Sequence, residues 1–251
     1  IQETNPRDIS SLHGIVLMGS PLDKEPCKRY MKVLTPNIFN GYGTTETFWN
    51  VFLRPYDLPD KAGYAGGACT DDDVRVVRVD TTKHVSPDEL VPMDKETVGE
   101  VVIFAPNKST FAYYDNPKTT EEKFHNGWLY TGDLATWDEH AYITIIGRKD
   151  DMIVSAGENI YPVQVESILN EHPKVAESLV FGIPDPKRGS VIAALIRPSD
   201  PSLTEKEMKQ FCMNHPMLAP YKRPRIFRFV KELPHNATGK LLHKLPPDFK
   251  F

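Results

Sequence analysis

A short glycine- and threonine-rich segment near the start of the chain has the composition of a phosphate-binding turn. Residues 41–46 read GYGTTE. Glycines let the backbone approach a ligand closely, and the two threonine hydroxyls can donate hydrogen bonds to phosphate oxygens. The Glu46 carboxylate is the kind of oxygen ligand that Mg²⁺ prefers, and Tyr42 offers a flat face to a nucleotide base. By itself the segment is explained equally well as a turn that follows a strand.

Three later segments also carry side chains suited to this chemistry. Residues 128–133 (WLYTGD) end on Asp133, whose ionised carboxylate can accept both hydroxyls of a ribose diol. Residues 147–159 contain a cluster of charged residues where the pattern of elements changes, and such a junction is a natural hinge. Residues 234–240 (PHNATGK) end on Lys240, a point charge suited to oxyanions, although the spacing of a Walker loop is absent. Taken singly, these segments are more often a solvated turn, a linker and a surface lysine.

Composition excludes several other classes of protein. The eight histidines have no metal-ligand spacing, no GxSxG elbow is present, and the three cysteines form no CxxC pair, which argues against a zinc site, a serine-hydrolase site and a disulfide scaffold. A reducing, cytoplasmic compartment fits best. The net charge of −4 gives no surplus that would favour nucleic acid, and no apolar run approaches the roughly 18 residues that cross a bilayer.

The elements that would position these residues change in character near residue 148. Earlier in the chain, short runs rich in apolar and β-branched residues predict strands, and one amphipathic run predicts a helix at 23–34. These strand candidates lie at 14–18, 73–79, 99–105 and 142–146. Later, strands and helices alternate over roughly 100 residues. The strand candidates there are 152–154, 176–183, 190–196 and 225–230, and the helices are 162–171 and 204–214.

Two local signals support these later helices. Pro162 stands where it can be the first residue of a helix, and Thr204 with Glu207 has the spacing of a capping box. The pattern therefore predicts an α/β, β-rich first part joined to a compact α+β second part.

In this order and at these separations, the segments resemble the adenylate-forming superfamily. That superfamily includes acyl-CoA synthetases, aryl-CoA ligases, peptide-synthetase adenylation domains and beetle luciferases. The resemblance covers essentially the whole chain, and its most specific part is the run YITIIGRKDDMIVSAGENIYPVQVE. It implies that residues 1–148 are the carboxyl-terminal portion of a large AMP-binding domain, with mixed sheets and a barrel-like portion. Residues 149–251 would then be a complete, small and mobile lid domain.

The resemblance implies a nucleotide site in the first part. Tyr42 would stack on adenine, Asp133 would bind the ribose diol, and Arg148 would reach the same ribose. Thr45 would contact the adenylate phosphate, and Glu46 would hold Mg²⁺. The other residues that would line the nucleotide are Gly19, Ser20, Gly43 and Thr44.

The resemblance also implies roles for residues of the second part. Lys240 would bridge the carboxylate and the phosphate during adenylation, acting with Thr45 and Glu46 as the catalytic set. Asp150 would be the hinge about which the lid rotates. The residues implied to contact coenzyme A are Ala156, Gly157, Tyr221 and Arg223.

The sequence departs from the family pattern at three places. Ala112 replaces the usual glycine of a GYYN-like phrase, which here reads AYYD at 112–115, and Ser20 stands where alanine is common. The Ser/Thr/Gly-rich phosphate loop, which in this family lies well upstream, is not in the sequence. We therefore expect an enzyme about twice the length of these 251 residues, with a missing amino-terminal half, and we expect the isolated chain to be inactive.

The expected function is that of an AMP-forming acyl-CoA ligase. It would use ATP and Mg²⁺ to activate a fatty or aromatic carboxylic acid as an acyl-adenylate, and it would then transfer the acyl group to the thiol of coenzyme A. Three alternatives stay open at this point. They are an adenylation domain that serves a carrier-protein thiol, a luciferase-type oxygenase, and a non-catalytic fragment that binds nucleotide or coenzyme A. A homodimer is also left open.

Overall fold

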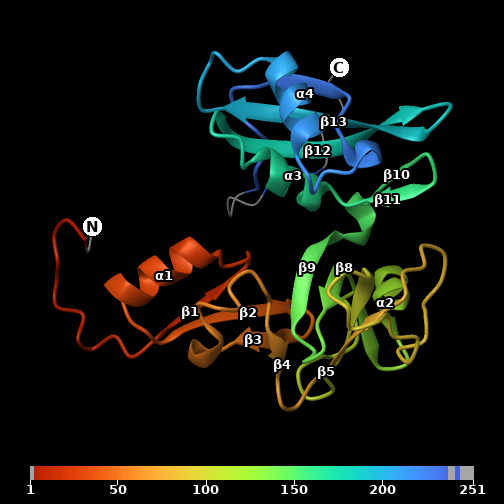
Figure 1. Cartoon of the computed structure of the whole chain (residues 1–251). Helices are drawn as coiled ribbons and strands as arrows, with labels where there is room; N and C mark the ends of the chain where they lie inside the picture. Colours follow the sequence, from red (N-terminus) through yellow and green to blue (C-terminus); the bar gives the residue numbers. More distant parts are fainter. Residues whose placement is uncertain (1–2, 237–240, 244–251) are drawn as a thin grey trace. The chain divides into compact units, whose positions relative to one another are not determined.

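The computed structural model describes residues 3–236 and 241–243, and Figure 1 shows the helices and strands that they form. Contacts along the chain separate a first unit, which ends at Ile146, from a second unit, which begins at Gly147. Each unit has its own buried core and is described by itself. The division lies close to the predicted boundary between residues 148 and 149. The interpretation of the second unit as a mobile lid stays a prediction.

The first unit contains a four-stranded sheet in the order β1-β2-β3-β4. Its strands are β1 (Ile15–Met18), β2 (Ile38–Thr44), β3 (Phe48–Leu53) and β4 (Gly67–Ala68). β1 and β2 are parallel, and the other pairs are antiparallel. Helix α1 (Lys24–Val33) connects the two parallel strands, because parallel neighbours need a crossover.

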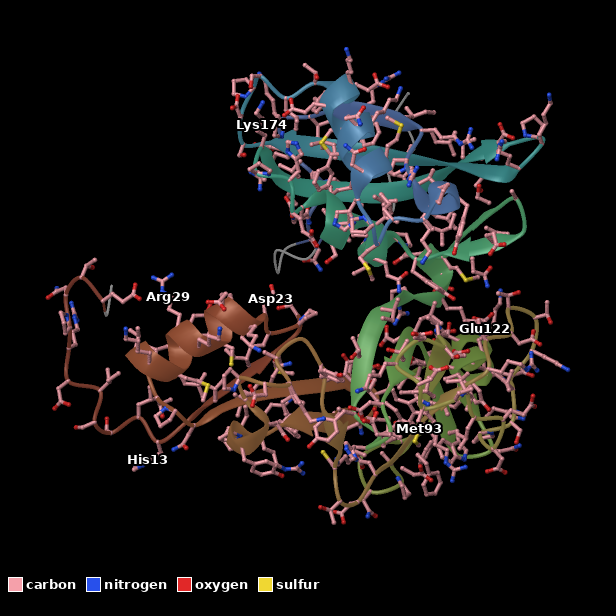
Figure 2. All side chains as sticks on the ribbon, viewed as in Figure 1. His13, Asp23, Arg29, Met93, Glu122 and Lys174 are labelled. Carbon is pink, nitrogen blue, oxygen red and sulfur yellow. The ribbon has the colours of Figure 1, made fainter. Side chains whose placement is uncertain are left out.

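Helix α1 covers one face of this sheet. Apolar side chains from the helix, the strands and the following loop bury each other there: Leu22, Cys27, Ile38, Leu53 and Leu58. The side chains of Asp23 and Arg29 lie at the outer surface of this helical segment (Figure 2). The predicted helix at 23–34 and the predicted strand at 14–18 are therefore both present.

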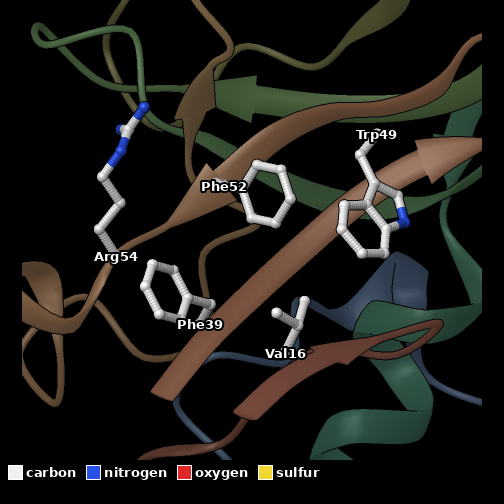
Figure 3. A pocket seen from close by; sticks show the side chains of 5 residues that line it. All are labelled: Val16, Phe39, Trp49, Phe52 and Arg54. Carbon is white, nitrogen blue, oxygen red and sulfur yellow. The ribbon is translucent and has the colours of Figure 1, made fainter. Parts of the chain in front are cut away.

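The opposite face of the same sheet is apolar and open. Side chains of successive strand residues point to opposite faces, so Val16 and Met18 point away from α1 and are 45% and 55% exposed. A hollow of about 260 Å³ lies on this face (Figure 3). Its lining is Val16, Phe39, Trp49, Phe52 and Arg54.

The second sheet of the first unit has five strands and forms the curled, barrel-like part (Figure 1). Its strands are β5 (Asp73–Val77), β6 (Gly99–Phe104), β7 (Phe124–His125), β8 (Trp128–Trp137) and β9 (Ile143–Arg148). β8 is the central strand, since it pairs with β6, β7 and β9. Helix α2 (Pro117–Lys123) precedes β7 and is capped by the Asn116 side chain, which accepts from Thr119 N. Valine, isoleucine and leucine side chains of β5, β6, β8 and β9 make half of the buried core, and Trp137 and alanines contribute to the rest.

The second unit is a three-stranded sheet with two helices and a hairpin. The sheet has the order β12-β13-β14, with β12 antiparallel and β14 parallel to β13. Its elements are β10 (Ile153–Ser155), β11 (Glu158–Ile160), α3 (Pro162–Leu169), β12 (Val175–Asp185), β13 (Gly189–Pro198), α4 (Glu205–Asn214) and β14 (Ile226–Phe229). Three short 3₁₀ helices also lie in the described part of the chain: η1 (Pro55–Asp57), η2 (Lys149–Asp151) and η3 (Pro220–Lys222).

The predicted α/β and α+β class is confirmed, and so are the local signals at both helix starts. Pro162 begins α3, and Thr204 caps α4 by accepting from Glu207 N at 3.2 Å. The pattern did not predict β3 or α2, nor that residues 128–133 lie inside the long strand β8 and not in a turn. None of the helices in the described part of the chain has the length and apolar character needed to cross a bilayer.

Candidate functional site

The GYGTTE segment forms the end of β2 and the turn into β3. Gly43 pairs with Trp49 and Thr44 with Phe48, so the chain reverses over residues 45–47. A side chain at position 43 would collide with the backbone of Phe48, which explains why glycine stands there. The turn leaves Thr45 exposed and Glu46 half-buried. Both side chains are therefore within reach of a ligand that approaches this edge of the sheet.

The turn after β1 lies at the same edge. β1 and β2 are parallel, and Met18 pairs with Gly41, so the residues after both strands are neighbours at the carboxyl ends. Gly19 adopts a φ of 92° and has no atom within 4 Å of the place where a side chain would start, and Ser20 is exposed. The carboxyl edge of parallel strands is where open α/β sheets bind ligands.

Tyr42 and Asp133 are brought together from positions 91 residues apart. The Tyr42 hydroxyl donates a hydrogen bond of 2.6 Å to Asp133 Oδ2. Tyr42 also packs its ring against the core of the five-stranded sheet. The two residues that the sequence assigned to adenine and ribose therefore share one place in the fold.

A bulge in β8 directs Asp133 toward this place. The pairing of β6 with β8 shifts between Val102, opposite Tyr130, and Glu100, opposite Leu134. Gly132 has a φ of 74° and donates from its N–H to Glu100 Oε1 at 3.2 Å. Bulges of this kind re-aim side chains next to ligand sites, so the glycine of the TGD phrase determines where the aspartate points.

Glu46 is held by a residue that sequence reasoning did not assign to the site. The hydroxyl of Tyr113 donates a hydrogen bond to Glu46 Oε1. Burial alone would raise the pKa of Glu46, but hydrogen bonds from Tyr113 and Thr44 and the charge of Lys123 lower it below the usual value. The carboxylate is therefore ionised near neutral pH and is suited to bind a cation.

A hydrogen-bonded network supports the turn from behind. Thr44 Oγ1 lies 2.9 Å from Thr47 Oγ1, and Thr47 donates to Asn50 Oδ1 at 2.7 Å. Asn50 in turn donates to Asp72 Oδ2 at 2.9 Å, and Lys108 donates to the same oxygen at 2.6 Å. Hydrogen-bonded networks of this kind rigidify the segment that they support, although the second oxygen of Asp72, Oδ1, is buried without a hydrogen-bond partner among the described residues.

The donor set around Glu46 fits Mg²⁺. The ion takes oxygen ligands and is typically held by one or two carboxylates together with substrate phosphates. Glu46 with the neighbouring hydroxyls of Thr44 and Thr45 offers such a set. Among residues 3–236 and 241–243, no group of three or more histidine, cysteine, aspartate or glutamate side chains could hold a metal by itself. The phosphates of a nucleotide would therefore supply the remaining ligands.

The second unit carries Arg148, which was assigned to the ribose, together with the residues assigned to motion and to coenzyme A. Arg148 ends β9 and is half-buried, and Asp150 is an exposed residue of η2. Ala156 and Gly157 form the two-residue turn of the β10–β11 hairpin, with φ values of 52° and 86°, as two-residue hairpin turns require. No atom lies within 4 Å of the point where a Gly157 side chain would start, so this turn is open to a ligand.

Tyr221 and Arg223 belong to η3 and to the residue after it. Tyr221 is 47% exposed, whereas Arg223 donates from Nε to the backbone oxygen of Leu218 at 3.0 Å. The contact of both residues with coenzyme A stays a prediction.

Lys240 lies outside the described residues, but residues on either side of positions 237–240 are described. His235 forms an antiparallel bridge with Leu241, and Leu242 N donates to Pro234 O at 2.9 Å. His235 Nε2 lies 2.8 Å from Glu177 Oε1, and this bond raises the pKa of His235.

After positions 237–240, His243 Nε2 lies 2.9 and 3.1 Å from the two oxygens of the buried Glu166. Histidine–glutamate pairs therefore hold the described residues on both sides of positions 237–240, and the sequence analysis assigned no role to either histidine.

Comparisons with known proteins agree with this geometry. Residues 2–114 match the model of the AMP-binding enzyme family, and residues 164–240 match the model of the AMP-binding enzyme C-terminal domain. The chain belongs to the adenylate-forming, AMP-binding enzymes. The predicted family resemblance is therefore confirmed, with both models in the expected order.

Adenylate-forming relatives of known specificity match nearly all of the chain. A long-chain-fatty-acid–CoA ligase of Escherichia coli O157:H7 is 33% identical over 243 residues, which are 97% of this chain and 41% of the relative. A 2-succinylbenzoate–CoA ligase of Bacillus cereus strain Q1 is 37% identical over 243 residues, 96% of this chain and 47% of the relative. The chain thus spans less than half the length of these relatives.

A solved structure of an adenylate-forming enzyme also superimposes on this chain. The o-succinylbenzoate CoA synthetase of Bacillus subtilis, in complex with its acyl-adenylate intermediate, has a TM-score of 0.81 and 33% identity. The match covers 99% of this chain and 48% of that protein. The same synthetase has also been solved with ATP and a magnesium ion, and that form matches with a TM-score of 0.78 and 33% identity over 96% of this chain and 47% of its own.

Proposed function

We propose that this chain is the carboxyl-terminal part of an AMP-forming acyl-CoA ligase. The observation that carries the proposal is the convergence of the nucleotide residues in the first unit. Tyr42 and Asp133 are hydrogen-bonded to each other, and the turn that follows the strand of Tyr42 carries Thr45 and the ionised Glu46 at the carboxyl edge of two parallel strands. A base, a ribose and a phosphate–magnesium group could follow one another along these residues.

The proposed reaction begins with attack of a carboxylate oxygen on the α-phosphorus of ATP, which releases pyrophosphate. Carboxylic acids are already ionised near neutral pH, so no protein base is needed. Negative charge develops on the phosphoryl oxygens, where Thr45 and Lys240 would donate hydrogen bonds. A preorganised donor of this kind typically contributes about 10²–10³ in rate. Mg²⁺, when bound, supplies further positive charge beside these oxygens, and Glu46 would hold it.

The second step transfers the acyl group to coenzyme A. The thiol attacks the carbonyl carbon of the acyl-adenylate, the bond to the phosphate oxygen breaks, and AMP leaves. The open Ala156-Gly157 turn would line the path of the thiol, and Tyr221 with Arg223 would contact the nucleotide end of coenzyme A. Rotation of the second unit about Asp150 would withdraw Lys240 from the acyl-adenylate and bring the Ala156-Gly157 turn to it.

The acid substrate is proposed at the level of its class. The relatives act on long-chain fatty acids and on 2-succinylbenzoate, so a fatty or an aromatic carboxylic acid is the proposed substrate. A cytoplasmic location belongs to the same proposal, because the three cysteines are free and acyl-CoA synthesis consumes intracellular ATP and coenzyme A. The homodimer stays a prediction without structural support.

The role of Lys240 is the sharpest test of this function. In the complete enzyme, Lys240→Ala removes a cation that only the first step needs. We expect acid-dependent pyrophosphate release to fall by about 10²–10³, while thioester formation from synthetic acyl-adenylate and coenzyme A stays within a few-fold of normal. Both half-reactions are measured on the same preparation.

The nearby Lys231 is exposed and provides a control, because Lys231→Ala removes the same charge outside the PHNATGK loop. Equal losses in both half-reactions of Lys240→Ala would contradict the assignment. Two of the three alternatives are tested in the same assays. A carrier-domain adenylating enzyme would release pyrophosphate but form no CoA thioester, and a non-catalytic fragment would do neither.

A further inference from the structure

The segment between β6 and α2 carries a tyrosine whose role the proposed reaction does not explain. Tyr113 belongs to the AYYD phrase, in which the sequence departs from the family pattern. Its hydroxyl donates to Glu46 Oε1 across 67 positions of sequence. The neighbouring Tyr114 is fully exposed, so only one of the two tyrosines of this phrase reaches the site.

Several contacts hold Tyr113 in a defined place. Its backbone N–H donates to Thr120 Oγ1 at 2.9 Å, and Thr120 Oγ1 donates to Asn116 O at 2.8 Å. The Tyr113 ring packs on the Phe124 ring with a centroid distance of 5.8 Å. The Phe111 ring packs on the Phe124 ring as well, also at 5.8 Å. Backbone and ring are therefore both secured by the segment that contains α2, and the phenol is presented in one orientation.

This phenol restricts the orientation of the Glu46 carboxylate. An ionised carboxylate accepts several hydrogen bonds, so a bond to Oε1 leaves acceptor capacity for a cation. The turn that carries Glu46 is exposed at Thr45, and a glutamate side chain in such a turn would otherwise sample several rotamers. Groups that hydrogen-bond to a metal ligand determine its orientation, and their loss commonly costs 10–100-fold in metal affinity or activity.

We propose that Tyr113 is a positioning residue that orients Glu46 toward the Mg²⁺ ion accompanying ATP. The proposal rests on the proposed function, in which Glu46 holds that ion. Tyr113 would not touch the reacting atoms. Its effect would be confined to the step that needs ATP and Mg²⁺, and thioester formation from a preformed acyl-adenylate would not require it.

The test is Tyr113→Phe in the complete enzyme, because this change removes the hydroxyl and keeps the ring on Phe124. ATP binding is measured by calorimetry at a series of Mg²⁺ concentrations, without the acid, so that no turnover occurs. We expect the Mg²⁺ concentration that gives half-maximal ATP binding to rise about 10-fold. Thioester formation from synthetic acyl-adenylate is expected to stay unchanged. Tyr114→Phe is the matched control and should leave both measurements unchanged.

A second variant keeps the proposal testable if Tyr113→Phe folds poorly. Thr120→Val removes the acceptor of the Tyr113 N–H and leaves the phenol in place, so we expect a smaller rise in the same Mg²⁺ concentration. An unchanged Mg²⁺ dependence in the folded variants, or an equal loss in both half-reactions, would overturn the proposal.

Glu46→Gln separates this proposal from the proposed function. If Glu46→Gln raises the Mg²⁺ concentration that gives half-maximal ATP binding and Tyr113→Phe does not, Tyr113 has no positioning role and the assignment of Glu46 stands. If Glu46→Gln itself leaves the Mg²⁺ dependence unchanged, the assignment of the metal ligand is wrong, and the proposal for Tyr113 fails with it.

Discussion

At the scale of single residues, the hydrogen bond between Tyr42 and Asp133 raises a question about ligand binding. Asp133 accepts a hydrogen bond from Tyr42 in the structure, and it is proposed to accept two from the ribose. An ionised carboxylate has room for all three, since its two oxygens offer about four acceptor sites. The pair could therefore persist when the nucleotide binds, and Tyr42 would then orient the carboxylate as well as stack on the base.

The charge of Asp133 should matter more than the hydroxyl of Tyr42. Asp133→Asn keeps the size of the side chain but replaces one acceptor oxygen with a donor and removes the charge. Hydrogen bonds to charged groups contribute about 1.5–3 kcal/mol, so we expect ATP affinity of the complete enzyme to fall roughly 10- to 100-fold, measured by calorimetry. Tyr42→Phe retains the ring and should cost less than 10-fold. A larger loss in Tyr42→Phe than in Asp133→Asn would contradict these roles.

At the scale of elements, two irregular strands determine the geometry of the site. The bulge in β8 directs Asp133, and the pairing of β2 with β3 shifts at Tyr42 and Gly43. The sequence contained the glycines of both places but not the identity of the partner strands. The phrase WLYTGD was not predicted as a strand, and a turn was weighed for it, because glycine and aspartate are turn residues and Thr131 is the one β-branched residue of the phrase. Pairing with β6 and β9 overrides that signal.

The 3₁₀ element η2 is the place where we predict the hinge. Asp150→Pro in the complete enzyme restricts φ to about −65° and removes an N–H donor, whereas a hinge residue must absorb a large dihedral change. We expect one conformation to be trapped. First-turnover pyrophosphate release should stay near normal, and CoA-thioester formation should fall by orders of magnitude.

Lys149, the first residue of the same element, is the second candidate for the hinge, so Lys149→Pro is the control. Normal thioester production by Asp150→Pro would show that the hinge lies elsewhere or that no rotation is needed.

At the scale of the whole molecule, the two units have separate buried cores. Neither core contains the phosphate loop of this family, and the relatives that match the chain are more than twice as long as the matched part. The isolated chain of 251 residues should therefore fold, at least within each unit, without forming acyl-adenylate. Its folding is checked by cooperative thermal unfolding, and its activity by acid-dependent pyrophosphate release with ATP and Mg²⁺. Robust release by the pure chain would show that the upstream phosphate loop is dispensable.

The sequence by itself determined the family, the order of the motifs and the identity of most candidate residues. It could do so because this chemistry depends on particular residue types at particular positions along the chain, such as the carboxylate of Glu46 and the ammonium of Lys240. It also located the helix starts at Pro162 and Thr204, since capping is a local interaction.

Only the tertiary structure decided which of these residues share a site. Tyr42 meets Asp133 and Glu46 meets Tyr113 across long stretches of sequence, and the histidines beside the Lys240 loop find their glutamates in the same way. Such contacts depend on strand pairing, register and bulges, which arise from the packing of distant segments and not from local propensity. A hydroxyl that orients a metal ligand leaves no distinctive pattern in the chain, which is why the folded structure was needed to reveal Tyr113.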